Sequence, residues 1–139
     1  MSLPSLFKAT SAANLRVVSV RVKGTDTVVA DDGVVKPVTT ASIVFPIATL
    51  PAKAVVTAVG TRAAAATTGT IAISIGATSV RANAVVADGG ASVVALTGLD
   101  SPLAAPQDVT LTVGTTIVTG DDFTVDIQYY IADAADVVL

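Results

Sequence analysis

The sequence predicts an all-β protein, an antiparallel β-sandwich of about eight to ten short strands. First, the composition favours strands, because Val and Thr are frequent, Glu is absent and all 11 acidic residues are Asp, which prefers turns and caps. Second, apolar and polar residues alternate in several windows, as in half-buried strands. Third, turn residues recur roughly every 8–12 residues, and no window keeps a helical period. At 139 residues the chain is expected to form one domain.

The first elements are an alternating strand and a short hairpin. Residues 16–24 alternate in polarity, and one face carries Val18, Val20 and Val22. Residues 25–38 place an Asp-Asp-Gly sequence between two short pairs of valines. This arrangement predicts a hairpin, because Gly tolerates the positive φ that tight turns require.

The next two strands are expected in different environments. In residues 41–47, Pro46 removes one donor for sheet hydrogen bonds, so this strand lies at an edge or ends there. Residues 52–63 are apolar on both faces, as expected for a strand that is covered on both sides. Residues 63–80 carry no charge but contain Thr, Ser and Gly, and their large apolar residues alternate. A membrane span needs about 20 predominantly apolar residues, so we expect no membrane segment here.

Further strands follow, with a second predicted hairpin. Residues 70–76 alternate, with isoleucines on one face, and residues 108–114 repeat the pattern with Val and Leu. Between them, residues 79–87 and 91–97 flank the Asp-Gly-Gly sequence at 88–90, which resembles a hairpin turn.

The clearest periodicity lies near the C-terminus. Residues 115–122 supply a turn through Gly120, and residues 121–131 alternate over the whole window. This predicts a long, half-buried strand. Its apolar face carries Phe123, Val125, Ile127, Tyr129 and Ile131, and its polar face carries Asp122, Thr124, Asp126, Gln128 and Tyr130.

The two ends of the chain differ from the strand-rich body at 15–132. We expect residues 1–14 to form an extended N-terminal arm and residues 133–139 a C-terminal tail, each of which either frays or becomes ordered on a partner. The opening residues lack an apolar segment of the length that a signal peptide needs. Candidate interface residues in these ends are Leu3, Leu6, Phe7, Val137, Val138 and Leu139.

Charged residues are scarce, at 14% against roughly 25% in an ordinary soluble domain, and the mean hydropathy is +0.74. We expect a partner to cover some apolar surface, because large apolar patches are rare on monomers; the alternative is an Ala- and Val-rich composition without functional meaning. Residues 50–76, whose only charges are Lys53 and Arg62, are expected to form two strands and a loop buried by sheet packing and a neighbour. A net charge of -3 without a basic cluster argues against nucleic-acid binding.

The residue types that catalysis needs are largely absent, so we expect no enzyme. The chain has no His and no Cys, which removes the commonest general base and the thiolate metal sites. The doublets Asp31–Asp32 and Asp121–Asp122 lie beside Gly in turns and lack the spacing of a calcium loop, which favours solvated turn acids over a calcium site. We therefore expect no cofactor and no metal. Tyr130, on the outer face of the last strand, is a candidate for a polar contact patch.

Residues 46–131 resemble small structural proteins of tailed phages, in particular capsid decoration (cement) proteins. The shared pattern is a strand that begins Leu-Pro-Ala, a strand that ends in Ile-Gly, and a last strand with alternating Val, Ile and Tyr after a Gly. The matching residues are Leu50, Pro51, Ala52, Val55, Ile75, Gly76, Gly120, Val125, Ile127 and Tyr129. The resemblance implies a jelly-roll-like fold, a homo-oligomer (often a trimer), and binding to the major capsid protein on the surface of the virion, after synthesis in the host cytoplasm.

Two alternatives stay open from the sequence. The chain is also compatible with a tail or head-fibre component. A third reading is a sugar- or calcium-binding sandwich module, which would be a monomer that its ligand stabilises.

Overall fold

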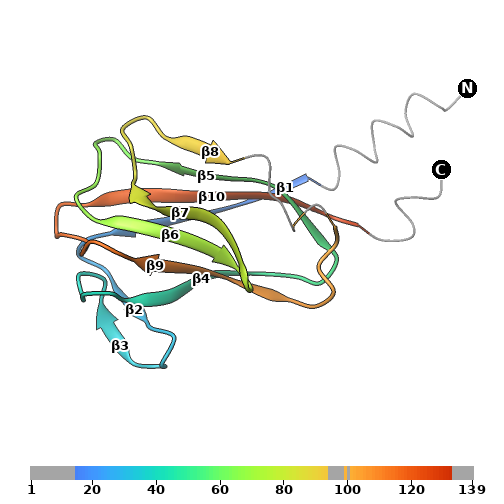
Figure 1. The fold of residues 1–139 in the computed structure, drawn as a ribbon, viewed down its shortest axis with the longest axis horizontal. Helices are drawn as coiled ribbons and strands as arrows, with labels where there is room; N and C mark the ends of the chain where they lie inside the picture. The colour runs from blue at the N-terminus through green and yellow to red at the C-terminus, as the bar shows by residue number, and fades with distance from the viewer. Residues whose placement is uncertain (1–14, 94–98, 100, 133–139) are drawn as a thin grey trace, which may run out of the picture.

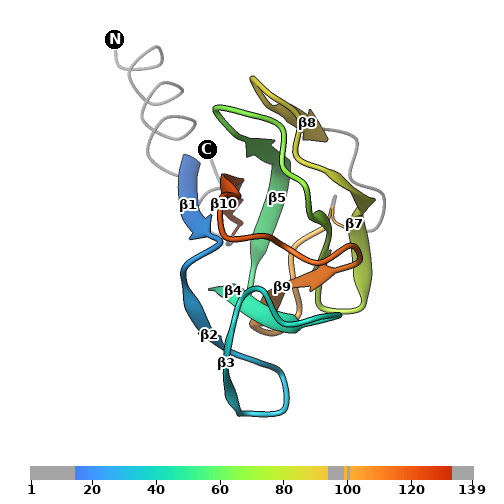
Figure 2. The same cartoon turned by 90° about the vertical axis from the view of Figure 1, so that its left-hand side faces the viewer.

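The computed structural model describes residues 15–93, 99 and 101–132 and has the all-β fold that the sequence predicts. Ten strands lie within these residues, and their pairings are antiparallel. Eight strands form two four-stranded sheets that pack as a sandwich, and two form a separate hairpin (Figures 1 and 2). In this described part of the chain, no helix is long and apolar enough to cross a membrane.

The first sheet has the strand order β1-β10-β5-β8, and the second sheet has the order β4-β9-β6-β7. The strands of the first sheet are β1 (Leu15–Lys23), β10 (Asp122–Ile131), β5 (Ala54–Arg62) and β8 (Ala91–Val93). Those of the second sheet are β4 (Val44–Leu50), β9 (Gln107–Val113), β6 (Thr70–Ile75) and β7 (Thr78–Val85).

The connectivity is that of a jelly roll, in which a long antiparallel hairpin is rolled up into two sheets. Among the eight sandwich strands, the first pairs with the last, β1 with β10, and the second with the seventh, β4 with β9. The third and sixth, β5 and β8, and the fourth and fifth, β6 and β7, pair in the same way. Pairing of β10 with β5 and of β9 with β6 completes the two sheets.

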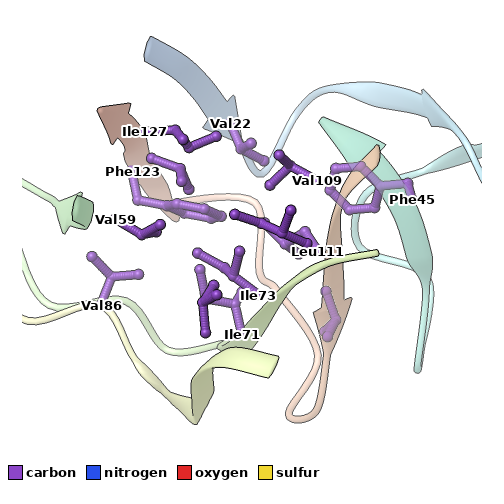
Figure 3. Close-up of a cluster of buried hydrophobic side chains, with 14 of the residues drawn as sticks. Val22, Phe45, Val59, Ile71, Ile73, Val86, Val109, Leu111, Phe123 and Ile127 are labelled. Atoms are coloured by element: carbon purple, nitrogen blue, oxygen red, sulfur yellow. The ribbon is translucent and has the colours of Figure 1, made fainter. Parts of the chain in front are cut away.

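Alternating side chains of both sheets fill the space between them. Figure 3 shows Phe123 and Val59 of the first sheet pointing toward Ile73 and Leu111 of the second. Complete burial of one such side chain stabilises the fold by about 1.5–3 kcal/mol, so these positions hold the sheets together. Of the residues predicted to face inward in three strands, Ile131 is only partly buried. The others are buried: Ile71, Ile73, Ile75, Val109, Leu111, Val113, Phe123, Val125, Ile127 and Tyr129.

The hairpin predicted at 25–38 is confirmed as β2 (Thr27–Val29) paired with β3 (Val35–Pro37), and it projects from the sandwich at the bottom of Figure 1. The Asp-Asp-Gly sequence forms its turn, in which Gly33 has φ +81°. The next strand, β4, lies at a sheet edge as Pro46 predicts, and it continues past the proline through a register shift between Pro46 and Ala48.

The hairpin predicted around residues 88–90 is wrong. The strands on its two sides, β7 and β8, belong to different sheets and pair with β6 and β5. Gly89 and Gly90 do have positive φ, at +83° and +95°, but they turn the chain during a crossover between the sheets. Here the Gly89 N–H donates to the carbonyl of Ala63. The turn that the Asp-Gly-Gly sequence predicts is therefore present, with glycines at positive φ. The predicted pairing of the two flanking strands is wrong, because packing between distant parts of the chain decides which strands pair.

Candidate functional site

Exposed apolar side chains gather where β1 begins and β10 ends. Leu15 is directly opposite Tyr130 in the β1–β10 pair, and their exposed fractions are 50% and 38%. Val17, the next outward residue of β1, is 57% exposed. These three residues form what we call the terminal patch. Residues 1–14 precede Leu15 and residues 133–139 follow Ala132, so both end segments join the body beside this patch.

The structure tests the placement of one predicted interface residue. Tyr130 lies on the outer face of β10, as predicted, and belongs to the terminal patch. The sequence-based prediction did not include Leu15 and Val17 among the interface residues. The alternation in residues 16–24 nevertheless indicates an exposed Val17, because Val17 faces outward if Val18 and Val20 face inward. The other candidates, Leu3, Leu6, Phe7, Val137, Val138 and Leu139, lie outside the described residues.

Two ion pairs lie farther along the outer face of the first sheet. The Nη2 of Arg21 lies 2.6 Å from Oδ2 of Asp122, and its Nε lies 2.9 Å from Oδ1, so the contact is bidentate. The Nε of Arg62 lies 2.8 Å from Oδ2 of Asp126, and the other oxygen of this carboxylate, Oδ1, accepts a hydrogen bond from the Ser19 hydroxyl. Beside these pairs lie two open hollows of about 570 and 420 Å³.

Both carboxylates on this face are held in the ionised form. The hydrogen bond from Arg21 lowers the pKa of Asp122, and the reciprocal contact raises the pKa of Arg21. The hydrogen bond from Arg62 lowers the pKa of Asp126 against an opposing effect of partial burial, and the Ser19 hydroxyl lowers it further. Each carboxylate is thus already paired with a cation. The face therefore presents a polar, charge-balanced surface for contact and not a poised acid or base.

A second apolar surface lies on the β2–β3 hairpin. Val29 and Val35 are directly opposite each other and are 55% and 66% exposed, and Val34 beside them is 51% exposed. The other face of the hairpin is attached to the body, because Val28 packs against the core. The Nζ of Lys36 lies 2.9 Å from Oδ2 of Asp32. We call Val29, Val34 and Val35 the hairpin patch.

From the sequence, the hairpin patch could be predicted only as pairs of valines within a hairpin. The residue types alone indicate apolar strands, and they do not show that one face of a two-stranded unit is left uncovered. That outcome depends on β2–β3 lying outside both sheets.

The two aspartates of the 121–122 doublet have different roles, and the expectation of solvated turn acids is wrong for Asp121. Its side chain is buried, with 5% exposed. Oδ1 accepts a hydrogen bond from the N–H of Thr68 at 2.8 Å, and Oδ2 accepts those of Gly69 and Val118 at 3.0 and 3.1 Å. Asp121 therefore fastens the turn before β10 to the loop before β6. Asp122 is partly exposed and pairs with Arg21.

The first doublet has a local role too. One Asp32 oxygen accepts the N–H of Val34 at 3.0 Å inside the hairpin turn, and the N–H of Asp31 donates to the carbonyl of Val44. Among the described residues, no three His, Cys, Asp or Glu side chains come together in a way that could hold a metal ion. The geometry of the described residues therefore gives no support to a calcium centre.

Comparisons with known proteins agree with the fold. No protein-family model matches the chain, and no curated protein matches its sequence. Among solved structures, a chain in the capsid of Ralstonia phage GP4 is similar with a TM-score of 0.59 and 14% identity, over 88% of this chain and 88% of that one. A chain in the capsid asymmetric unit of cyanophage Pam1 is similar with a TM-score of 0.55 and 18% identity, over 86% of each chain. At such identities the likeness shows a shared jelly-roll-like fold.

Proposed function

We propose that this chain is a non-enzymatic structural protein of a phage virion, which binds the major capsid protein of an assembled shell as a homo-oligomer and stabilises that shell. The observation that carries the proposal is the whole-chain likeness to chains of two phage capsids. Because the shared region makes up equal shares of both chains, the matched chains are close to this one in length. The likeness thus extends over most of each matched chain.

The two apolar patches support the same proposal. The terminal patch and the hairpin patch are exposed in the part of the chain that the structure describes, and exposed apolar surface of this kind marks places where proteins bind one another. A shell offers many copies of the same site, so an oligomer with several modest contacts gains strength from their combined effective concentration. The outer face between Arg21 and Arg62 is charge-balanced and supplies a polar rim.

The test is binding of the full chain to shells assembled from the major capsid protein of the phage that encodes it. We expect a variant without residues 1–14 to keep its fold and to occupy the shells less. A double variant, Val29→Ser with Val35→Ser, tests the hairpin patch, and Thr27→Ser on the same hairpin is the matched control. Full occupancy by the arm-deleted variant would remove the arm from the proposal, and full occupancy by the double variant would remove the hairpin patch. No binding by the wild-type chain would overturn the shell-binding function.

A tail or head-fibre role makes a different prediction, because the chain would then occupy a vertex or the tail instead of the shell surface. An electron-microscopy image of labelled virions separates the two. A sugar- or calcium-binding module would instead be a monomer whose melting temperature rises with glycan or calcium by mass action. Sedimentation and melting of the purified chain, with and without each ligand, check this reading.

A further inference from the structure

The edge strand β1 lacks the backbone devices that protect the other sheet edges that the structure describes. An edge strand presents unpaired N–H and C=O groups, and proteins usually protect it by shortness, proline or a bulge. The edge strand β8 has only 3 residues, β4 contains Pro46 and a register shift, and β7 has register shifts against β6. In contrast, β1 pairs with β10 without any shift, contains neither Pro nor Gly, and lies at the margin of the sandwich (Figure 2).

The unpaired backbone groups of this edge belong to alternate residues and end before Lys23. The N–H of Lys23 donates to Oδ2 of Asp26 at 2.9 Å, and its C=O accepts the N–H of Asp26, so these groups point away from β10 and are already bonded. Backbone groups alternate in direction along a strand, so every second residue before Lys23 points the same way. These residues are Leu15, Val17, Ser19 and Arg21. Within the described part of the chain no strand pairs with this side of β1, which leaves an available stretch at 15–21 that is centred on Val18.

A second copy of the same stretch can pair with it about a two-fold axis. When the axis passes through Val18, Val17 lies opposite Ser19 of the second copy in an antiparallel pair. By the same count, Leu15 lies opposite Arg21. All four residues with unpaired backbone groups then form hydrogen-bonded pairs, and the turn after the stretch stays outside. An axis moved toward either end would leave some of these groups unpaired or would meet that turn.

The same register covers apolar side chains on both faces of the sheet. On the inner face, Val18 and Val20 are only partly buried, whereas the β10 residues beside them are completely buried. Pairing would place Val18 against its own copy and Val20 against the aliphatic stem of Arg16. On the outer face, Val17 is 57% exposed and would lie diagonal to its own copy. The second strand thus supplies the apolar cover that β1 lacks.

The basic residues of β1 favour this register over its neighbours. Lys and Arg on an edge strand usually discourage pairing. Here Arg21 is already held by Asp122 of its own sheet through two hydrogen bonds. With the axis at Val18, Arg16 faces Val20 and Arg21 faces Leu15, so no two cations of the paired stretches lie opposite each other. An axis at either arginine would instead set two arginines directly opposite, which is unfavourable. The stretch therefore matches its own copy in length, backbone pattern and charge, as a two-fold interface requires.

We propose that two copies of this chain pair through residues 15–21 of β1, antiparallel about a two-fold axis at Val18, so that their first sheets join into one continuous sheet. The pairing rests on the proposed function only in that both require a homo-oligomer, and it names the dimer as the unit of that oligomer. The shell plays no part in the contact, so the two proposals can fail separately.

The register can be tested by cross-linking, because the chain contains no Cys. At the axis, Val18 and its copy form a non-hydrogen-bonded pair with Cα atoms about 4.5 Å apart, a distance that a disulfide spans. Val18→Cys should therefore give a disulfide-linked dimer on mild oxidation, as seen by non-reducing electrophoresis. The matched control is Val20→Cys, on the same face and also partly buried, whose two copies would be about four residues or ~13 Å apart. Cross-linking of neither variant, or of both equally, would overturn the inference.

The backbone contribution can be tested at Val17. Val17→Pro removes an N–H that points to the second copy and leaves the bonds between β1 and β10 in place. It should raise the dissociation constant of the dimer about thirtyfold in sedimentation, because each copy loses one backbone hydrogen bond. Val17→Thr is the matched control, since it keeps the N–H and the β-branched shape, and its effect should be far smaller. Equal effects of the two substitutions would refute pairing at this edge. Circular dichroism and melting check that each variant is folded.

The remaining outcomes separate this inference from the proposed function. A monomeric wild-type chain would overturn the pairing, including a chain that associates only after removal of residues 1–14 or 133–139, because an end of the same chain would then cover the edge. A monomer that still binds shells would leave shell binding intact. A dimer that cross-links through Val18→Cys and does not bind shells would support the pairing and overturn the shell-binding function.

Discussion

Replacing the buried carboxylate of Asp121 should be among the most damaging changes that leave the hydrophobic core intact. Its two oxygens accept the N–H groups of Thr68, Gly69 and Val118, which belong to two separate connections. In Asp121→Ala these three donors lose their acceptor in a site where the side chain is 5% exposed. A buried donor without a partner costs free energy, because it has given up its hydrogen bond to water.

The size of the effect follows from these three bonds. A hydrogen bond to a charged group contributes about 1.5–3 kcal/mol, and the contributions of bonds that share one carboxylate are not additive. Water can enter the vacated space beside the turn and replace part of the loss. We therefore expect Asp121→Ala to lower the free energy of unfolding by about 3–5 kcal/mol, a large share of the ~5–15 kcal/mol that is typical of a domain. Asp121→Asn should cost about 2 kcal/mol or more, since its amide group would face at least one N–H donor.

Urea unfolding followed by circular dichroism measures these differences. The matched control is Asp122→Asn at the neighbouring position, which removes a solvent-screened ion pair with Arg21 and should change the free energy of unfolding far less than Asp121→Ala does. If Asp121→Ala and Asp122→Asn have equal unfolding midpoints, the fastening role of Asp121 is refuted. A changed slope with denaturant in Asp121→Ala would show instead that the variant no longer unfolds in one step.

Three further predictions test the core, a close backbone contact and the ion pairs. Leu111→Ala should lower the free energy of unfolding by about 2–5 kcal/mol, whereas Val35→Ala on the exposed hairpin should change it by less than about 0.5 kcal/mol, as measured by urea unfolding. A Cβ at Gly24 would clash with the carbonyl oxygen of Val118, so Gly24→Ala should cost about 2 kcal/mol or more in the same assay, while Gly120→Ala, whose Cβ meets nothing within 4 Å, should be tolerated. Because the pKa of Asp126 is lowered in the fold, its stabilising contribution is complete above the ordinary Asp value of about 3.9 and is lost as the pH falls through the lower folded value. Melting temperatures should thus decline less steeply below about pH 4 in Asp126→Asn than in the wild-type chain, and parallel curves would contradict this role.

The strand faces could be predicted because the alternation depends only on local geometry. Phe123 and Ile127 share a face in any β-strand, and only one face of such a strand here is apolar enough to be the inner one. The order of the strands could not be obtained in this way. The Asp-Gly-Gly sequence at 88–90 permits a hairpin equally well as a crossover, and the sandwich places β8 beside β5 because that pairing completes the first sheet.

The candidate site shows a similar division. The outward direction of Tyr130 was predictable from alternation, but the contrast between Asp121 and Asp122 was not. Both residues follow Gly120 in one turn and have the same local sequence signal. Only the approach of the Thr68–Gly69 backbone from a distant connection makes one of them a buried acceptor.

The pairing of the first sandwich strand with the last has a consequence for the timing of folding. Ser19 of β1 lies opposite Asp126 of β10, a separation of 107 residues along the chain. Contacts between such distant positions slow folding, since a long loop must close before they can form. During translation β1 must wait for β10, which is synthesised last among the described strands, so the valines of β1 stay without their native neighbour until then. Premature self-association of nascent chains is a hazard at this stage, and Arg16, Arg21 and Lys23 reduce it by mutual repulsion.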